Sequence, residues 1–172
     1  RENYFLHRST FEYGVSAAAS IASYYINNGQ TVGFGCMAQQ PVILPAEKGE
    51  RQLGKILETL AFLRPEGQTP LHGLVLAQAG NLPRGCSVVL ISSSTSSSLV
   101  IAADTLIRRE LKPIVVFINP AGFGREDASN RENVDLLIKW KIPYFEINYG
   151  DSLLSVLETG QTNSNYKNVI TG

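Results

Sequence analysis

The sequence predicts a three-layer α/β fold built around a mostly parallel sheet. Runs of about five hydrophobic residues alternate with segments whose apolar residues recur at helical spacing, which is typical of parallel strands joined by right-handed crossover helices. The clearest runs lie at 87–91, 114–118 and 144–147. A length of 172 residues corresponds to one domain over 1–172.

The composition excludes several classes of protein. Charged residues make up 17% of the chain, below the roughly 25% of an average globular protein, and hydrophobic residues make up 44%, which excludes disorder. The formal net charge is zero, so no basic face for nucleic acid is expected. No apolar run approaches the roughly 20 residues that span a bilayer, so we expect no membrane contact by this chain. Cys36 and Cys86 are expected to be reduced core thiols, which favours a cytoplasmic location.

The first half of the chain predicts two helices around a pair of strands. Ser9 and Glu12 have the spacing of a capping box, and Gly29 ends the helix that they begin. This helix is uncharged and rich in small residues, so we expect it to be covered on most sides and to approach a sheet closely. The runs 31–37 and 41–45 predict strands, the second at a sheet edge because prolines bound it. A helical stripe then follows, made of Leu53, Ile56, Leu57, Leu60 and Leu63.

The second half predicts helices and strands in alternation. Thr69 is expected to cap a helix that begins at Pro70, and the run 87–91 is the best candidate for a central strand. Asp151 is expected to cap the last helix. The apolar sides of the first two helices are predicted to be Leu71, Leu74, Val75 and Leu82, and then Leu99, Ala103, Leu106 and Ile107; Val134, Leu137 and Ile138 mark a third helix.

The chain begins with a helix, whereas a doubly wound sheet normally begins with a strand. We therefore expect the opening strand to be absent and the chain to be a fragment of a longer protein. The strands at 31–36 and 87–91 would flank the missing strand and leave backbone groups unpaired. Three arrangements could fill the gap: direct pairing of these strands, the segment Tyr4-Phe5-Leu6, or an edge donated by a second copy in a homodimer.

Several segments together resemble domain-of-unknown-function family 58, a von Willebrand factor A-like group. The most specific are FEYGVSAAASIA at 11–22 and TVGF at 31–34. The others are QLGKILETLA at 52–61, VVLIS at 88–92, IPY at 142–144 and GDSL at 150–153. The resemblance implies a Rossmann-like, von Willebrand factor A-type sheet with strand order 3-2-1-4-5-6. It also implies a cytoplasmic adaptor of a MoxR-type AAA+ ATPase, at the C-terminal end of a protein that often carries membrane helices upstream, without enzymatic activity or cofactor.

Related domains bind a divalent cation at a metal-ion-dependent adhesion site made from three loops. The first loop carries an Asp-x-Ser-x-Ser motif, which would lie on the absent strand. Thr69 matches the threonine of the second loop, but Ser93 stands where the third loop has an aspartate. Mg²⁺ prefers hard, charged oxygen ligands, so we expect a degenerate site and no bound metal.

The candidate ligand or partner-binding residues are Thr69 together with Ser92, Ser93, Ser94 and Thr95. The serine-rich stretch follows the 87–91 strand, and ligands bind at the carboxyl ends of strands in open α/β sheets. The favoured alternative is that these hydroxyls only satisfy a turn and cap the next helix. The loop at 122–127 would complete the face, although a plain turn explains its glycines. His72 could face the same loops, but a surface position on its helix is favoured.

We therefore expect a non-catalytic protein-interaction module with this face as its binding surface. No nucleophile elbow, zinc-ligand spacing or phosphate-loop motif is present in the sequence. The alternative is a small-molecule or phosphate-binding enzyme domain that uses the same loops. A chain without its opening strand could also carry a split, inactive site.

Overall fold

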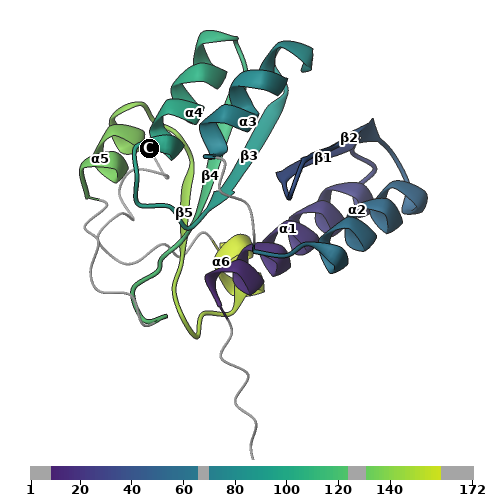
Figure 1. The fold of residues 1–172 in the computed structure, drawn as a ribbon, viewed down its shortest axis with the longest axis horizontal. Coiled ribbons are helices and arrows are strands. Elements are labelled where there is room, and N and C mark those ends of the chain that lie inside the picture. The colour runs from purple at the N-terminus through teal and green to yellow at the C-terminus, as the bar shows by residue number, and fades with distance from the viewer. Residues whose placement is uncertain (1–8, 66–69, 124–130, 160–172) are drawn as a thin grey trace, which may run out of the picture.

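The computed structural model describes residues 9–65, 70–123 and 131–159 and shows a mixed α/β architecture (Figure 1). The elements in chain order are α1 (Thr10–Asn27), β1 (Val32–Met37), β2 (Pro41–Glu47), α2 (Glu50–Phe62), α3 (Leu71–Gln78), a 3₁₀ turn (Ala79–Asn81), β3 (Ser87–Ser92), α4 (Ser98–Arg108), β4 (Lys112–Ile118), α5 (Arg131–Lys139), β5 (Tyr144–Ile147) and α6 (Leu153–Thr159). The predicted alternation of strands and helices is confirmed for this part of the chain.

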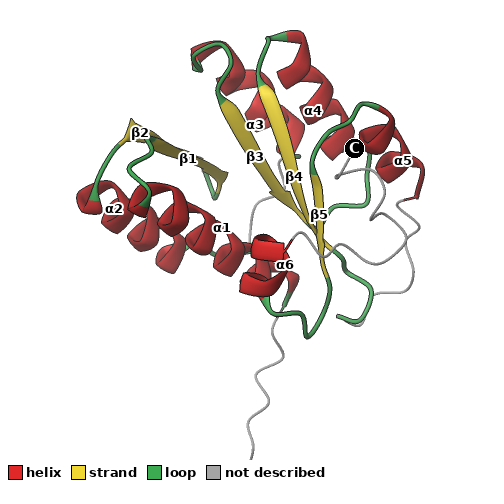
Figure 2. Cartoon of the chain, turned by 180° about the vertical axis from the view of Figure 1, so that it is seen from behind, coloured by secondary structure: helices red, strands yellow, loops and turns green. Residues whose placement is uncertain are grey.

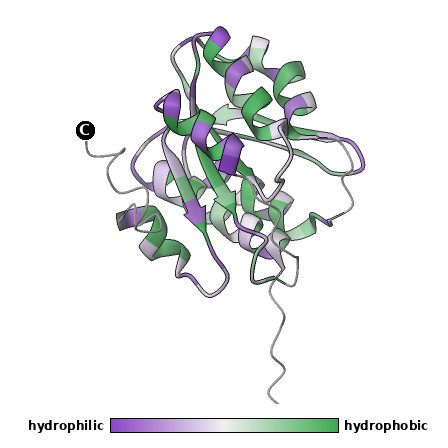
Figure 3. Ribbon diagram, turned by 90° about the vertical axis from the view of Figure 1, so that its left-hand side faces the viewer, coloured by the Kyte–Doolittle hydropathy of each residue, from purple (hydrophilic) through white to green (hydrophobic). Residues whose placement is uncertain are grey.

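A parallel three-stranded sheet in the order β3-β4-β5 forms the middle layer, with helices on both faces (Figure 2). Alternate residues of the strands point to opposite faces. Leu90, Val115 and Phe117 belong to the core under α3, α4 and α5, whereas Val116 and Ile118 belong to the core under α1 and α6. Hydrophobic residues colour much of the central ribbon, and hydrophilic residues lie on outer helix turns as well as on loops (Figure 3).

The expected single, mostly parallel sheet is instead divided into two sheets. β1 and β2 form an antiparallel hairpin of their own, and β1 does not pair with β3. The expectation that the 87–91 run is a central strand is therefore wrong for the described strands, because β3 lies at the edge of the sheet that they form. β4 is the central strand, with Val115 and Val116 exposed by only 0% and 1%. The segment Tyr4-Phe5-Leu6 lies outside the described residues.

The ends of α1 confirm the signals in the sequence. The Oγ of Ser9 accepts a hydrogen bond from the N–H of Glu12 at 3.2 Å. Gly29 has a φ of +76°, which favours glycine, and its N–H donates to the carbonyl of Ile26. α1 packs against β3 at Gly14, where a Cβ would lie 3.9 Å from Cγ2 of Ile91, an ordinary van der Waals distance.

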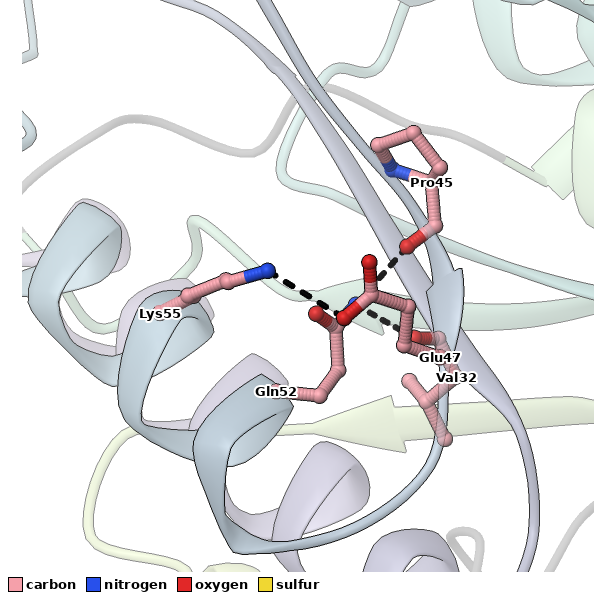
Figure 4. Close-up of polar contacts among 5 residues, drawn as sticks. All are labelled: Val32, Pro45, Glu47, Gln52 and Lys55. Carbon is pink, nitrogen blue, oxygen red and sulfur yellow. Dashed lines mark hydrogen bonds and ion pairs between the residues drawn. The ribbon is translucent and has the colours of Figure 1, made fainter.

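A buried glutamine attaches the hairpin to α2. Gln52 is 1% exposed, and its Nε2 donates to the carbonyls of Val32 at 2.8 Å and Pro45 at 2.9 Å (Figure 4). Both acceptors are backbone groups that need a partner inside the protein. The neighbouring ion pair between Lys55 and Glu47 is 3.1 Å long but half-exposed, so it contributes little to stability.

Some predicted details of the helices are wrong. Leu57, Leu82 and Ile107 are 39%, 38% and 41% exposed, because they lie at the margins of their apolar stripes or beyond the helix end. Pro70 itself occupies the N-cap position of α3, and Thr69 lies outside the described residues.

The predicted cap of the last helix is also wrong. The Oδ2 of Asp151 accepts from the N–H of Asn148 at 2.8 Å and closes the turn after β5. Ser152 instead caps α6, because its Oγ accepts from the N–H of Ser155.

Among the described residues, no helix has both the length and the apolar character needed to cross a membrane.

We predict that Gln52→Leu lowers the free energy of unfolding by about 2–4 kcal/mol, because it leaves two backbone carbonyls without their donor. Urea denaturation followed by circular dichroism measures the change. Gln40→Leu is the control, because Gln40 lies exposed in the hairpin loop and its replacement should change the free energy by less than about 0.5 kcal/mol. Equal effects of the two substitutions would contradict the role assigned to Gln52.

Candidate functional site

A cavity of about 530 Å³ lies where the carboxyl ends of β1 and β3 approach the start of α3. We call it the carboxyl-edge cavity. This edge is where open α/β sheets bind their ligands. The residues that line it are Gly35, Cys36, Met37, Pro70, Leu71, Leu74, Ile91, Ser92, Ser93, Ser94, Ser96 and Ser98.

The serine loop makes a regular series of hydrogen bonds from backbone to side chain. The hydroxyl of Ser92 accepts from the N–H of Ser94 at 3.1 Å, and the hydroxyl of Ser94 accepts from the N–H of Ser96 at 3.3 Å. Ser96 and Ser98 repeat the pattern at 3.3 Å. Each bond joins residues two positions apart, as in the turns that serine favours. The loop is thus built by its own hydroxyls, which supports the turn-forming interpretation of its composition.

The structure brings together only part of the predicted face. Ser92, Ser93 and Ser94 line the carboxyl-edge cavity, whereas Thr95 is not among its lining residues. The carbonyl of Thr95 accepts from Nδ2 of Asn133 at 3.1 Å, which ties the loop to α5. Thr69 and residues 124–127 lie outside the described part of the chain.

His72 is better connected than the sequence indicated. The interpretation of His72 as a surface residue is wrong in part, because it is half-buried and contacts Ser98. The backbone N–H of His72 donates to Oγ of Ser98 at 3.2 Å, and Nδ1 lies 3.0 Å from the same oxygen. Ser98 is only 5% exposed, so the pair joins the first turns of α3 and α4 inside the protein. In the sequence, only the position of His72 in the first turn of its helix indicates that it could contact the neighbouring loop.

A second polar cluster, at the carboxyl ends of β4 and β5, was missed by the sequence reasoning. The Nδ2 of Asn119 donates to Oε1 of Glu146 at 2.9 Å and to Oδ1 of Asn148 at 3.0 Å. The Oδ1 of Asn119 accepts from the N–H of Ala121 at 3.0 Å. These bonds join the segment after β4 to the end of β5 and to the turn that follows it. No sequence motif marks the cluster, since its members meet only through the pairing of β4 with β5.

The carboxyl-edge cavity is electrically neutral over its described lining, which includes no charged side chain. Cys36 borders it, and burial raises the pKa of this thiol, so the protonated form predominates at neutral pH. Within the described ranges, no three His, Cys, Asp or Glu side chains are grouped so that they could hold a metal ion. The described lining therefore offers hydroxyls, a thiol with a raised pKa and apolar contacts.

Comparison of the chain with protein-family models, curated proteins and solved structures finds no match.

We predict that Ser98→Ala lowers the free energy of unfolding by about 1–2 kcal/mol, because the half-buried N–H of His72 loses its acceptor. Ser97→Ala is the matched control: Ser97 is exposed, and its side chain makes no capping bond to α4. Thermal and urea unfolding measure both variants. A change of similar size in the two variants would show that the contact between α3 and α4 contributes nothing specific.

Proposed function

We propose that this chain is a non-catalytic protein-interaction module of the von Willebrand factor A-like type. Its binding surface is the carboxyl-edge cavity with the adjoining serine loop. The proposed partner is a MoxR-type AAA+ ATPase, for which the module acts as a cytoplasmic adaptor. The observation that carries the proposal is a neutral, hydroxyl-lined cavity at the edge of the sheet where α/β domains bind their ligands.

The arrangement of the strands supports the von Willebrand factor A-like part of the proposal. An antiparallel hairpin lies on one side and three parallel strands lie on the other, in the order β3-β4-β5. This layout is compatible with the resemblance to domain-of-unknown-function family 58, in which one more strand would stand between the two groups. The long helix α1 also corresponds to the most specific segment of that resemblance.

The chemistry of the lining favours an interaction surface over an active site. The hydroxyls of Ser92 and Ser94 accept from backbone N–H groups within the loop. A serine nucleophile needs a general base within hydrogen-bond reach. The imidazole of His72 lies 3.0 Å from the hydroxyl of Ser98, which belongs to the described lining, but Ser98 is only 5% exposed and so offers little access to a substrate. The surface thus presents hydrogen-bonding and apolar groups that a protein loop can match.

A small-molecule or phosphate-binding enzyme domain is the second candidate. The observation in its favour is the volume of the carboxyl-edge cavity, about 530 Å³, which falls within the roughly 300–1,000 Å³ of small-molecule sites.

We predict that Ser93→Arg weakens binding to the purified MoxR-type AAA+ ATPase of the source organism by about tenfold or more, or about 1.4 kcal/mol. The guanidinium would place a charge in a neutral cavity. Ser87→Arg is the control, because Ser87 is exposed at the opposite end of the same strand and should leave the affinity unchanged. Biolayer interferometry measures both affinities.

Absence of ATPase binding by the unaltered chain would contradict the adaptor role. If the chain also showed a saturable rise in melting temperature with inorganic phosphate or a nucleotide, abolished by Ser93→Arg, the enzyme candidate would replace it.

A further inference from the structure

A larger cavity of about 740 Å³ separates the hairpin from the parallel sheet. β1 and β3 form two of its sides, and α1 and α3 form the other two. In Figures 1 and 2 the hairpin stands apart from β3, with α1 extending beneath both. We call this cavity the interstrand slot. It extends along the whole of β3, because every residue from Cys86 to Ser93 contributes to its lining.

The β3 edge of the slot carries unpaired backbone groups. The N–H of Lys112 donates to the carbonyl of Cys86 at 3.0 Å, and the parallel register continues from Ser87 to Ser92. Because successive residues of a strand direct their N–H and C=O to alternate edges, those of Val89 and Ile91 point away from β4 and toward the slot. No other described strand pairs with them. Backbone groups in this position are normally satisfied by another strand.

The helix side chains around the slot are mostly apolar, although Thr10 of α1 and Gln78 of α3 also line it. Gly14, Val15 and Ala18 of α1 line one face, and Leu71 and Leu74 of α3 line the other. The described lining includes no charged residue. A strand buried on both faces is normally a continuous hydrophobic run, whereas a strand with one exposed face alternates. The slot is therefore suited to an uncharged strand that is aliphatic on both sides.

The two strands beside the slot run in the same direction. The carboxyl ends of β1, at Cys36 and Met37, and of β3, at Ile91 and Ser92, border the same carboxyl-edge cavity. An added strand would pair with both of them, and strands covered by helices on both faces are predominantly parallel.

We propose that the interstrand slot binds an extended, uncharged, aliphatic segment of polypeptide from outside residues 1–172 as an added strand parallel to β3. The segment is five or six residues long, to match the six residues of β3. Backbone hydrogen bonds to β1 and β3 supply affinity, and the apolar faces of α1 and α3 select its side chains, as in other cases of strand addition. This proposal does not depend on the adaptor role, which concerns the carboxyl-edge cavity.

The chain itself offers no suitable occupant. Outside the described residues, the longest apolar run is Tyr4-Phe5-Leu6, which is flanked by Asn3 and His7 and is too short to match β3. A second copy could offer the outer edge of β2, but Pro41 and Pro45 have no N–H to donate. Both sources therefore fit the slot less well than an aliphatic segment from elsewhere.

The test uses the purified chain and a fluorescein-labelled peptide with the sequence of residues 87–92, SVVLIS, flanked by lysines for solubility. We expect saturable binding by fluorescence anisotropy. The control peptide has proline in place of its second valine, which removes one N–H and the ladder bond that it makes, and should not bind. Equal binding of the two peptides, or binding of neither, would overturn the proposal.

Hydrogen exchange locates the binding. In the free protein, the amides of Val88 and Leu90 should exchange slowly because they pair with β4, whereas those of Val89 and Ile91 should exchange rapidly. Saturating peptide should slow the exchange of Val89 and Ile91. It should also protect Cys36 and Cys86, both of which line the slot, from alkylation by iodoacetamide.

A pair of helical glycines supplies matched variants. Gly14→Trp should place its ring in the slot and weaken peptide binding by about tenfold or more, because a Cβ at Gly14 already approaches Ile91. Gly54→Trp should leave binding unchanged, since a Cβ there meets nothing within 4 Å. If Gly14→Trp fails to fold, the proline peptide and the exchange pattern still decide the question.

Two outcomes would assign the slot to another occupant. Slow exchange at Val89 and Ile91 in the free monomer, lost in Phe5→Asp, would show that the chain's own N-terminal segment fills the slot. Slow exchange that depends on protein concentration would show that a second copy fills it. Either result would overturn the proposal.

Discussion

Pairing of β4 on both of its edges is the constraint on which the rest of the fold depends. β4 is hydrogen-bonded to β3 on one side and to β5 on the other, and its side chains alternate between the two cores. Val115 and Val116, neighbours in sequence, are thus buried under different helix layers. Because these strands are parallel, their carboxyl ends meet at one edge, where the serine loop and the Asn119 cluster are placed.

β3 is paired with a described strand on only one of its edges. Its sequence is rich in apolar residues like that of β4, yet Val88, Val89 and Ile91 are only half-buried, and no strand of the described part of the chain pairs with its second edge. The hairpin compensates locally: Gln52 satisfies two of its carbonyls, and Phe34 and Leu44 pack toward α1 and α2. Contacts with α1 and α2 therefore fix the position of the hairpin, whereas hydrogen bonds to neighbouring strands fix the position of β4.

Local patterns predicted most of the elements, and non-local contacts account for what they missed. The run 144–147 and the N-terminal cap at Ser9 depend on neighbours in sequence, and both are confirmed. Periodicity cannot show which strand pairs with which, so β3 was expected at the centre of its sheet. Nor can it show that Gln52 is buried, because its two acceptors lie 20 and 7 residues away. At the candidate site, the serine loop was visible in the composition, whereas the bond between His72 and Ser98 spans 26 residues and was not.

The two cavities are not independent of each other. Cys36, Leu74 and Ser93 line both the carboxyl-edge cavity and the interstrand slot. A strand in the slot would end beside Ser93, where it would narrow the carboxyl-edge cavity and restrict the serine loop. Any ligand of the cavity would then bind the filled and empty forms with different free energies. By linkage, the strand would change the free energy of ligand binding by the same amount as the ligand would change the free energy of strand binding. The occupant of the slot and the partner at the carboxyl edge would therefore change each other's affinity by the same factor.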